Sequence, residues 1–128
     1  MRLLLDTHFV IAILERRFER DYPRYAGVVL SDAAAPSVSV ASLWEIAIKT
    51  RIGKLDLNVR PDQVAQFCQD AGFGILPINE QHFVAVVDPD PPMKDPFDRL
   101  LLAQAQAEGM KLVTLDRVLA GHPQAWRP

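Results

Sequence analysis

The chain has 128 residues, of which 49% are hydrophobic and 23% are charged. This length and composition fit one globular domain over residues 1–128, and they exclude wholesale disorder. Fourteen Lys and Arg residues against 16 Asp and Glu residues give a net charge of −2. The protein therefore lacks the overall positive charge that would indicate nucleic-acid binding. Such a role would depend on the local placement of basic residues.

The cellular compartment is indicated by cysteine content and hydropathy. Cys68 is the single cysteine, which excludes an intramolecular disulfide and a cysteine-rich zinc site. No apolar run approaches the ~20 residues of a membrane span. The acid at position 6 comes too early for a secretory signal. We therefore expect a cytoplasmic protein with no membrane partner.

Short apolar runs alternate with helical patterns along the chain. The predicted strands are 2–5, 36–40, 75–78 and 111–115. The predicted helices are 7–17, 22–34, 42–51, 61–71, 80–87 and 95–108. Such alternation predicts an α/β fold, with a parallel sheet covered by helices on both faces.

Two of the predicted helices carry capping signals. Ser42 and Glu45 have the spacing of a capping box, in which the serine begins the helix. Asp95 stands directly before Pro96, a typical arrangement of an N-cap residue and the first helical position.

Four acids lie at the ends of the predicted elements: Asp6, Glu45, Asp98 and Asp116. Asp6 directly follows the first strand and Asp116 directly follows the last. In parallel sheets, sites form outside the carboxyl ends of the strands. Asp98 is favoured over Asp95 because capping alone explains Asp95. We expect the four acids to converge at that edge of the sheet.

Each of the four acids also has a structural explanation. Asp6 and Asp116 could cap the segments that follow them. Glu45 could belong to the capping box, or pair with Lys49 four residues on. Carboxylates that do converge repel one another unless a cation lies among them. An oxygen-only ligand set suits Mg²⁺ or Mn²⁺, which hydrolytic sites use to orient water and to offset charge on phosphodiesters.

Five segments carry a resemblance to a known family. They are Leu4-Leu5-Asp6-Thr7-His8, Val40-Ala41-Ser42-Leu43-Trp44-Glu45-Ile46-Ala47-Ile48-Lys49, Gly53-Lys54-Leu55, Asp95-Pro96-Phe97-Asp98-Arg99-Leu100-Leu101-Leu102-Ala103-Gln104-Ala105 and Leu112-Val113-Thr114-Leu115-Asp116. In this order they resemble the PIN-domain family and, within it, the VapC-type toxins of bacterial type II toxin–antitoxin systems.

The resemblance implies a three-layer α/β/α sandwich with a short, mostly parallel central sheet. It also implies an Mg²⁺- or Mn²⁺-dependent endoribonuclease, with Asp6, Glu45, Asp98 and Asp116 as the metal-binding and catalytic acids. Thr7 and Thr114 are expected to support them. The implied partners are an RNA substrate, a cognate small antitoxin and a second copy of the chain in a homodimer.

Several other side chains are open to more than one interpretation. The basic residues near the acids are candidate RNA contacts: Lys49, Arg51, Lys54 and Arg99. Trp44 could stack a base, although a core or interface position is favoured. His8 is expected to pack or to form a hydrogen bond, and His82 is expected at the surface.

Two alternatives to a ribonuclease stay open. A receiver-like Mg²⁺-binding signalling domain also has a doubly wound sheet, but it would need paired acids near the first strand and a phosphoacceptor after the third. A non-catalytic binding module of the PIN fold is the other alternative, and four intact acids argue against it.

Overall fold

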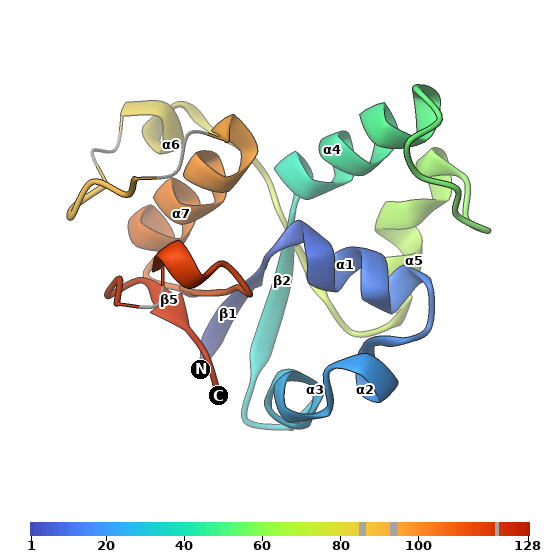
Figure 1. The fold of residues 1–128 in the computed structure, drawn as a ribbon, viewed down its shortest axis with the longest axis horizontal. Helices are drawn as coiled ribbons and strands as arrows, with labels where there is room; N and C mark the ends of the chain where they lie inside the picture. Colours follow the sequence, from blue (N-terminus) through green and yellow to red (C-terminus); the bar gives the residue numbers. More distant parts are fainter. Residues whose placement is uncertain (85–86, 93–94, 120) are drawn as a thin grey trace.

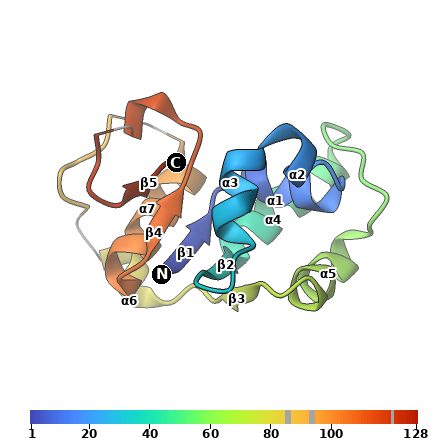
Figure 2. The same ribbon diagram turned by 90° about the horizontal axis from the view of Figure 1, so that it is seen from below.

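The computed structural model describes residues 1–84, 87–92, 95–119 and 121–128, and a five-stranded sheet lies at its centre (Figure 1). The strands run in the order β3-β2-β1-β4-β5, and all neighbouring pairs are parallel (Figure 2). The strands are β1 (Arg2–Leu5), β2 (Ala35–Ser39), β3 (Gly74–Leu76), β4 (Lys111–Val113) and β5 (Ala125–Trp126).

Helices connect the strands and cover the sheet. They are α1 (Thr7–Leu14), α2 (Phe18–Asp21), α3 (Pro23–Val29), α4 (Val40–Arg51), α5 (Val64–Asp70), α6 (Glu80–Val84) and α7 (Pro96–Glu108), with 3-10 turns η1 (Pro61–Gln63) and η2 (Arg117–Leu119). Among the described residues, no helix combines the length and the apolar character that crossing a membrane requires.

The central strand β1 divides the interior into two cores. Leu3 and Leu5 belong to a core that also contains side chains of α1, α2, α3 and α5. Leu4, between them, points to the opposite face and packs with α7. All three leucines are fully buried, because a strand covered on both faces alternates between two apolar layers. The expected three-layer α/β/α fold is confirmed, and Figure 1 shows α1 and α7 on opposite sides of β1.

The strand order places the candidate acids. From β1 the chain moves in one direction to β2 and β3, and then returns to add β4 and β5 on the other side. Such a reversal leaves a crevice outside the carboxyl ends of the two strands that flank it, here β1 and β4. Leu5 pairs with Val113, so the residues that follow them, Asp6 and Thr114, leave the sheet side by side.

Most predicted elements are present, with differences that have local causes. The predicted helix 7–17 ends at Leu14 because Arg16 adopts a φ of 58°, in the left-handed region that helices cannot continue through. The helix predicted over 80–87 is observed as α6, and its residues 85–86 lie outside the described residues. The sequence analysis did not predict β5, a strand of two residues.

The expectation that His82 lies at the surface is wrong, because its side chain is fully buried. Its Nδ1 accepts a hydrogen bond from the backbone N–H of Asn79 at 3.1 Å. Nε2 lies 3.7 Å from a carboxylate oxygen of Glu108, on α7. His82 therefore fixes the short helix α6 against α7. Cys68, by contrast, is buried in the core as predicted.

Candidate active site

Asp6 is held by four contacts at the end of β1. It is 5% exposed, and it is the N-cap of α1: Oδ1 accepts the backbone N–H of His8 at 2.7 Å. The same oxygen lies 2.8 Å from Nδ1 of the His8 ring, and Thr114 Oγ1 donates to Oδ2 at 3.1 Å. The backbone N–H of Asp6 donates to the carbonyl oxygen of Val113 at 3.0 Å, which extends the β1–β4 pairing by one residue. Asp6 thus combines the capping role with a fixed position at the crevice.

The histidine beside Asp6 forms a hydrogen bond, as the sequence analysis expected. His8 is mostly exposed. The hydrogen bond with Asp6 raises the pKa of the imidazole, and the negative charges of Asp6 and Asp98 act in the same direction, while burial opposes them. These influences place His8 in the same electrostatic neighbourhood as both acids.

Glu45 is brought to the same place by α4. The predicted Ser42 cap is wrong: α4 begins at Val40, and Ser39 is its N-cap, with Oγ accepting from the backbone N–H of Ala41. Ser42 lies inside the helix, where its hydroxyl forms a buried 2.9 Å hydrogen bond with that of Thr7. This bond joins α4 to the start of α1 and orients the helix face that carries Glu45. Sequence reasoning missed this role of Ser42, because a serine before an apolar helical pattern is also a capping signal.

The Glu45 side chain has two unequal carboxylate oxygens. Glu45 is 9% exposed, and its Oε2 lies 2.9 Å from Lys49 Nζ. The other oxygen, Oε1, is buried and has no hydrogen-bond partner among the described residues. A buried carboxylate oxygen without a donor is unfavourable. Glu45 therefore has an unused position that a cation or a proton donor could fill.

Asp98 lies in the first turn of α7, where Asp95 is the N-cap. Oδ1 of Asp95 accepts the backbone N–H groups of Phe97 and Asp98 at 2.9 and 3.3 Å. Asp98 itself is free of this task. Burial, followed by the charges of Asp95, Asp6 and Glu45, raises the pKa of Asp98 to about 6. The structure thus brings Asp6, Glu45 and Asp98 into one electrostatic cluster.

Asp116 is joined to this cluster indirectly. Its backbone N–H donates to Thr114 Oγ1 at 3.0 Å, and the same hydroxyl donates to Asp6. Its own carboxylate accepts the backbone N–H of Val118 at 2.9 Å and caps η2. Asp116 thus takes the capping role that was the structural alternative, and Thr114 connects it to Asp6.

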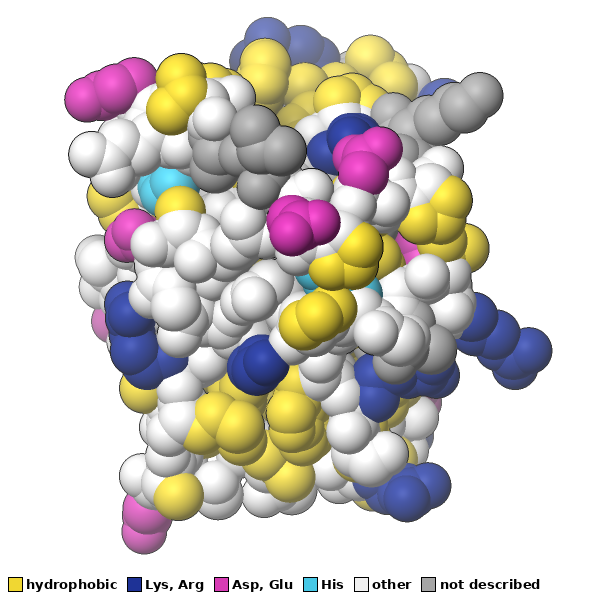
Figure 3. All heavy atoms as spheres, turned by 90° about the vertical axis from the view of Figure 1, so that its left-hand side faces the viewer, with side chains coloured by type: hydrophobic (Ala, Val, Ile, Leu, Met, Phe, Trp, Pro, Cys, Tyr) yellow, Lys and Arg dark blue, Asp and Glu magenta, His cyan; other side chains and the backbone are white. Residues whose placement is uncertain are grey.

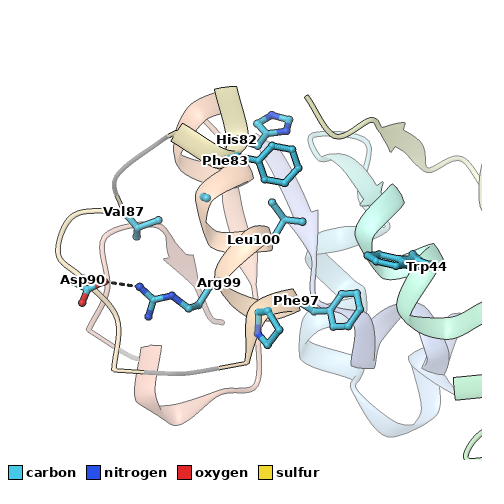
Figure 4. Close-up of a pocket in the computed structure, with 10 residues that line it drawn as sticks. Trp44, His82, Phe83, Val87, Asp90, Phe97, Arg99 and Leu100 are labelled. Atoms are coloured by element: carbon cyan, nitrogen blue, oxygen red, sulfur yellow. Dashed lines mark hydrogen bonds and ion pairs between the residues drawn. The ribbon is translucent and has the colours of Figure 1, made fainter. Parts of the chain in front are cut away.

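The four basic candidates lie at different distances from the acids. Lys49 is in the cluster through Glu45. Arg99 reaches away from it: Nη2 donates to Asp90 at 2.7 Å (Figure 4). Nη1 donates to the Pro91 carbonyl at 3.0 Å. Arg51 and Lys54 are exposed near the far end of α4.

An apolar hollow of about 650 Å³ is lined by residues of α4, α6 and α7. Trp44 and Phe97, each directly before an acid in sequence, meet edge to face with ring centroids 5.7 Å apart (Figure 4). Trp44 is 60% exposed, so the predicted core position for Trp44 is wrong. Phe83, which also lines the hollow, is 69% exposed.

Figure 3 shows hydrophobic patches among side chains of both charges on the face that carries α6 and α7. Exposed apolar patches of this kind are typical of interaction surfaces.

The donor set of the cluster fits a hard divalent cation in its chemistry. The three acids offer oxygen ligands, and one of these is the unpartnered Glu45 Oε1. Burial and the neighbouring negative charges raise the pKa of Asp98, and a bound cation would offset those charges. In the described part of the chain, no three His, Cys, Asp or Glu side chains stand ready to hold one ion together. Binding would therefore require side-chain rotation.

The comparisons with known proteins agree with this fold. The model of the PIN domain family matches residues 3–123, so the chain belongs to the PIN domain family. This family membership rules out the receiver-like signalling domain that the sequence analysis left open. A comparison with curated proteins gave no match.

Two solved structures share the fold. A chain of a toxin-antitoxin complex from Klebsiella pneumoniae has a TM-score of 0.65 at 18% identity, over 98% of this chain and 97% of that chain. A chain of VapBC2 from Rickettsia felis, solved bound to a DNA fragment from the promoter, has a TM-score of 0.67 at 14% identity, over 98% and 96%.

Proposed function

We propose that this chain, as one domain over residues 1–128, is a metal-dependent endoribonuclease and the toxin of a toxin–antitoxin pair. The observation that supports the nuclease most directly is that the charges of Asp6 and Glu45 act on Asp98, although the three acids belong to separate elements of a PIN domain. We place the activity in the cytoplasm, in keeping with the lone, buried Cys68.

The three clustered acids would hold Mg²⁺ or Mn²⁺, and Asp116 would act through a water molecule or a second ion. When bound, the cation would lower the pKa of a water molecule and offset the charge of the phosphodiester. The chain itself orients the acids. Thr114 and His8 hold the two oxygens of Asp6, and Asp95 caps α7 so that Asp98 stays available. The hydrogen bond between the hydroxyls of Ser42 and Thr7 fixes α4 against α1.

Cleavage of total RNA by the purified protein tests the nuclease. We expect cleavage with Mg²⁺ or Mn²⁺ and none with EDTA. Asp6→Asn, Glu45→Gln and Asp98→Asn should each reduce the rate by at least about 100-fold, because each removes the charge of a ligand with little change in volume. The control is Asp62→Asn, which removes the charge of an exposed acid in η1. Near-wild-type, metal-dependent cleavage by any of the three variants would remove that residue from the site.

The antitoxin proposal is supported by the structural neighbour from Klebsiella pneumoniae, which is a chain of a toxin-antitoxin complex. It is also supported by the apolar hollow that Trp44 and Phe97 line, which could accept a segment of a partner protein. We expect a small protein encoded next to this gene to bind the chain and to place an Arg or Lys at the acid cluster. Co-purification followed by the cleavage assay tests this, and a partner that leaves cleavage unchanged would contradict it.

The homodimer is proposed from the family resemblance. Light scattering on the purified chain, whose protomer has a mass of 14.3 kDa, should give twice that mass. A single species at the protomer mass across micromolar concentrations would contradict the dimer.

A further inference from the structure

Lys49 stands at the mouth of the acid cluster on the same face of α4 as Glu45. The helix spaces the two residues by four positions, and Nζ lies 2.9 Å from Glu45 Oε2. The lysine side chain is 41% exposed, whereas that of Glu45 is 11% exposed. The ammonium group therefore contacts a nearly buried carboxylate from the solvent side.

The pairing satisfies only half of the Glu45 carboxylate. Oε1 is buried and has no hydrogen-bond partner among the described residues. An ammonium group is a compact point charge on a flexible stem, so it can move without disturbing the helix. A divalent cation at Glu45 would compete with Lys49 for the same carboxylate and would offer it the larger charge.

The charge of Lys49 also reaches the residues around Asp6. The hydrogen bond with Asp6 dominates the raised pKa of His8, and Lys49 is the positive charge that opposes this rise. His8 in turn feels the charge of Asp98. Lys49 therefore contacts Glu45 and also lies near the pair formed by Asp6 and His8.

We propose that Lys49 is an exchangeable counter-ion of the active site. It neutralises Glu45 in the metal-free protein. When a divalent cation takes Glu45, the ammonium group is released to the mouth of the crevice, where it binds a phosphate of the RNA. This inference rests on the proposed ribonuclease function, and it makes Lys49 a residue that exchanges one anionic partner for another during the reaction cycle.

The simpler alternative is a helix-surface pair with no function. An exposed pair at this spacing contributes only about 0.3–0.5 kcal/mol, so its loss should leave metal affinity nearly unchanged. Displacement by the metal predicts a different result: without Lys49, the cation has no competitor for Glu45 and meets a more negative cluster.

Calorimetric titration with Mn²⁺ alone distinguishes the two. We expect Lys49→Gln to bind Mn²⁺ about tenfold more tightly than the wild type, the ratio that matches loss of one charge-assisted hydrogen bond in competition. Lys54→Gln removes the same charge from an exposed position on the same segment, and it should stay within about twofold of the wild type. Wild-type or weaker Mn²⁺ binding by Lys49→Gln overturns the inference. Absence of Mn²⁺ binding by the wild type would instead overturn the metal-dependent function itself, and the inference with it.

Steady-state RNA cleavage at saturating Mn²⁺ tests the second half of the exchange. We expect Lys49→Gln to raise KM about three- to tenfold while kcat changes by less than about threefold, because one phosphate contact is lost. The slope of log KM against log salt should decrease by about 0.7, the value for one contact to a single strand. Lys49→Arg keeps a cation at the mouth and should restore KM to within about twofold of the wild type. An unchanged KM in Lys49→Gln would overturn the transfer of Lys49 to the RNA.

Discussion

Asp98 combines partial burial with three neighbouring acids, and this gives the metal-free protein a pH dependence with a definite sign. The pKa of Asp98 in the folded state is about 6, above the reference value of 3.8. Between these values the folded state binds more protons than the unfolded state, so the free energy of unfolding falls as pH rises through this window. The contribution of Asp98 is therefore most favourable below about pH 4, and it is lost above about pH 6.

Asp98→Asn should remove that loss. In EDTA at pH 7.5 we expect the variant to be more stable than the wild type by about 1–2 kcal/mol, after allowance for solvent screening of a partly exposed group. The two proteins should converge near pH 4. Melting temperatures recorded from pH 4 to pH 8 provide the measurement. A wild-type profile as flat as that of Asp98→Asn would contradict the repulsion inferred at the cluster.

Asp95→Asn is the matched comparison, because asparagine also caps helices well. It removes one of the charges that raise the pKa of Asp98, so it should reduce the pH dependence in part. It should keep the full stabilisation by Mn²⁺. If Asp95→Asn loses the response to metal and Asp98→Asn retains it, Asp95 and not Asp98 is the ligand.

At the scale of residues, sequence patterns predicted candidate acids but not the partners of their side chains. Asp6, Glu45 and Asp98 stand beside apolar runs, which signals a carboxylate near the core. The contact from Thr114 to Asp6 spans 108 positions, and no local pattern encodes it. His82 was misplaced for the same reason, because its burial depends on Glu108, in a helix distant in sequence.

At the scale of elements, the start of α4 is the clearest case in which the structure corrects a prediction made from the sequence. Ser39 caps the helix and also donates a buried hydrogen bond to Gln104, on α7. Ser42 has neither contact. Among the described residues, its side chain forms one hydrogen bond, with the hydroxyl of Thr7. The cap therefore lies three residues earlier than the capping-box spacing predicted.

Ser39→Ala should destabilise the protein by about 2–3 kcal/mol. The change removes an N-cap, which contributes about 1 kcal/mol, and leaves a buried amide oxygen of Gln104 without its donor. We expect Ser42→Ala to cost about 1 kcal/mol, because only one neutral hydrogen bond is lost. Urea unfolding of the two variants gives the comparison. A larger loss in Ser42→Ala would restore Ser42 as the dominant residue at this helix start.

Element boundaries were predictable where a chemical stop signal exists. Gly109 ends α7 in the left-handed conformation, with a φ of 67°, as a glycine after a helix indicates. Arg16 adopts a similar φ without being glycine, so the end of α1 carried no such signal. The strand β5 has two residues, Ala125 and Trp126, too few to show any periodicity.

At the scale of the whole molecule, a cation bound at the cluster should stabilise the fold by mass action. With free Mn²⁺ at 100 times its dissociation constant, the expected gain is about 2.7 kcal/mol, or a rise in melting temperature of roughly 10 °C. Glu45→Gln should reduce this rise by more than half, whereas Asp62→Asn should keep it. Thermal melts with EDTA and with Mn²⁺ provide the test. Equal rises in all three proteins would place the bound ion elsewhere.

The reversal of strand order at β1 has a consequence for how each new molecule is made. The partner of Asp6, Thr114, is translated 108 residues after it. At ordinary translation rates of about 5–20 residues per second, that interval lasts roughly 5–20 s. During this interval β1 has no β4 to pair with. Asp6 Oδ2 also lacks the hydrogen bond that the Thr114 hydroxyl donates to it in the folded protein. The hydrogen bond between Asp6 and Thr114 can therefore form only after β1, β4 and everything between them have been synthesised.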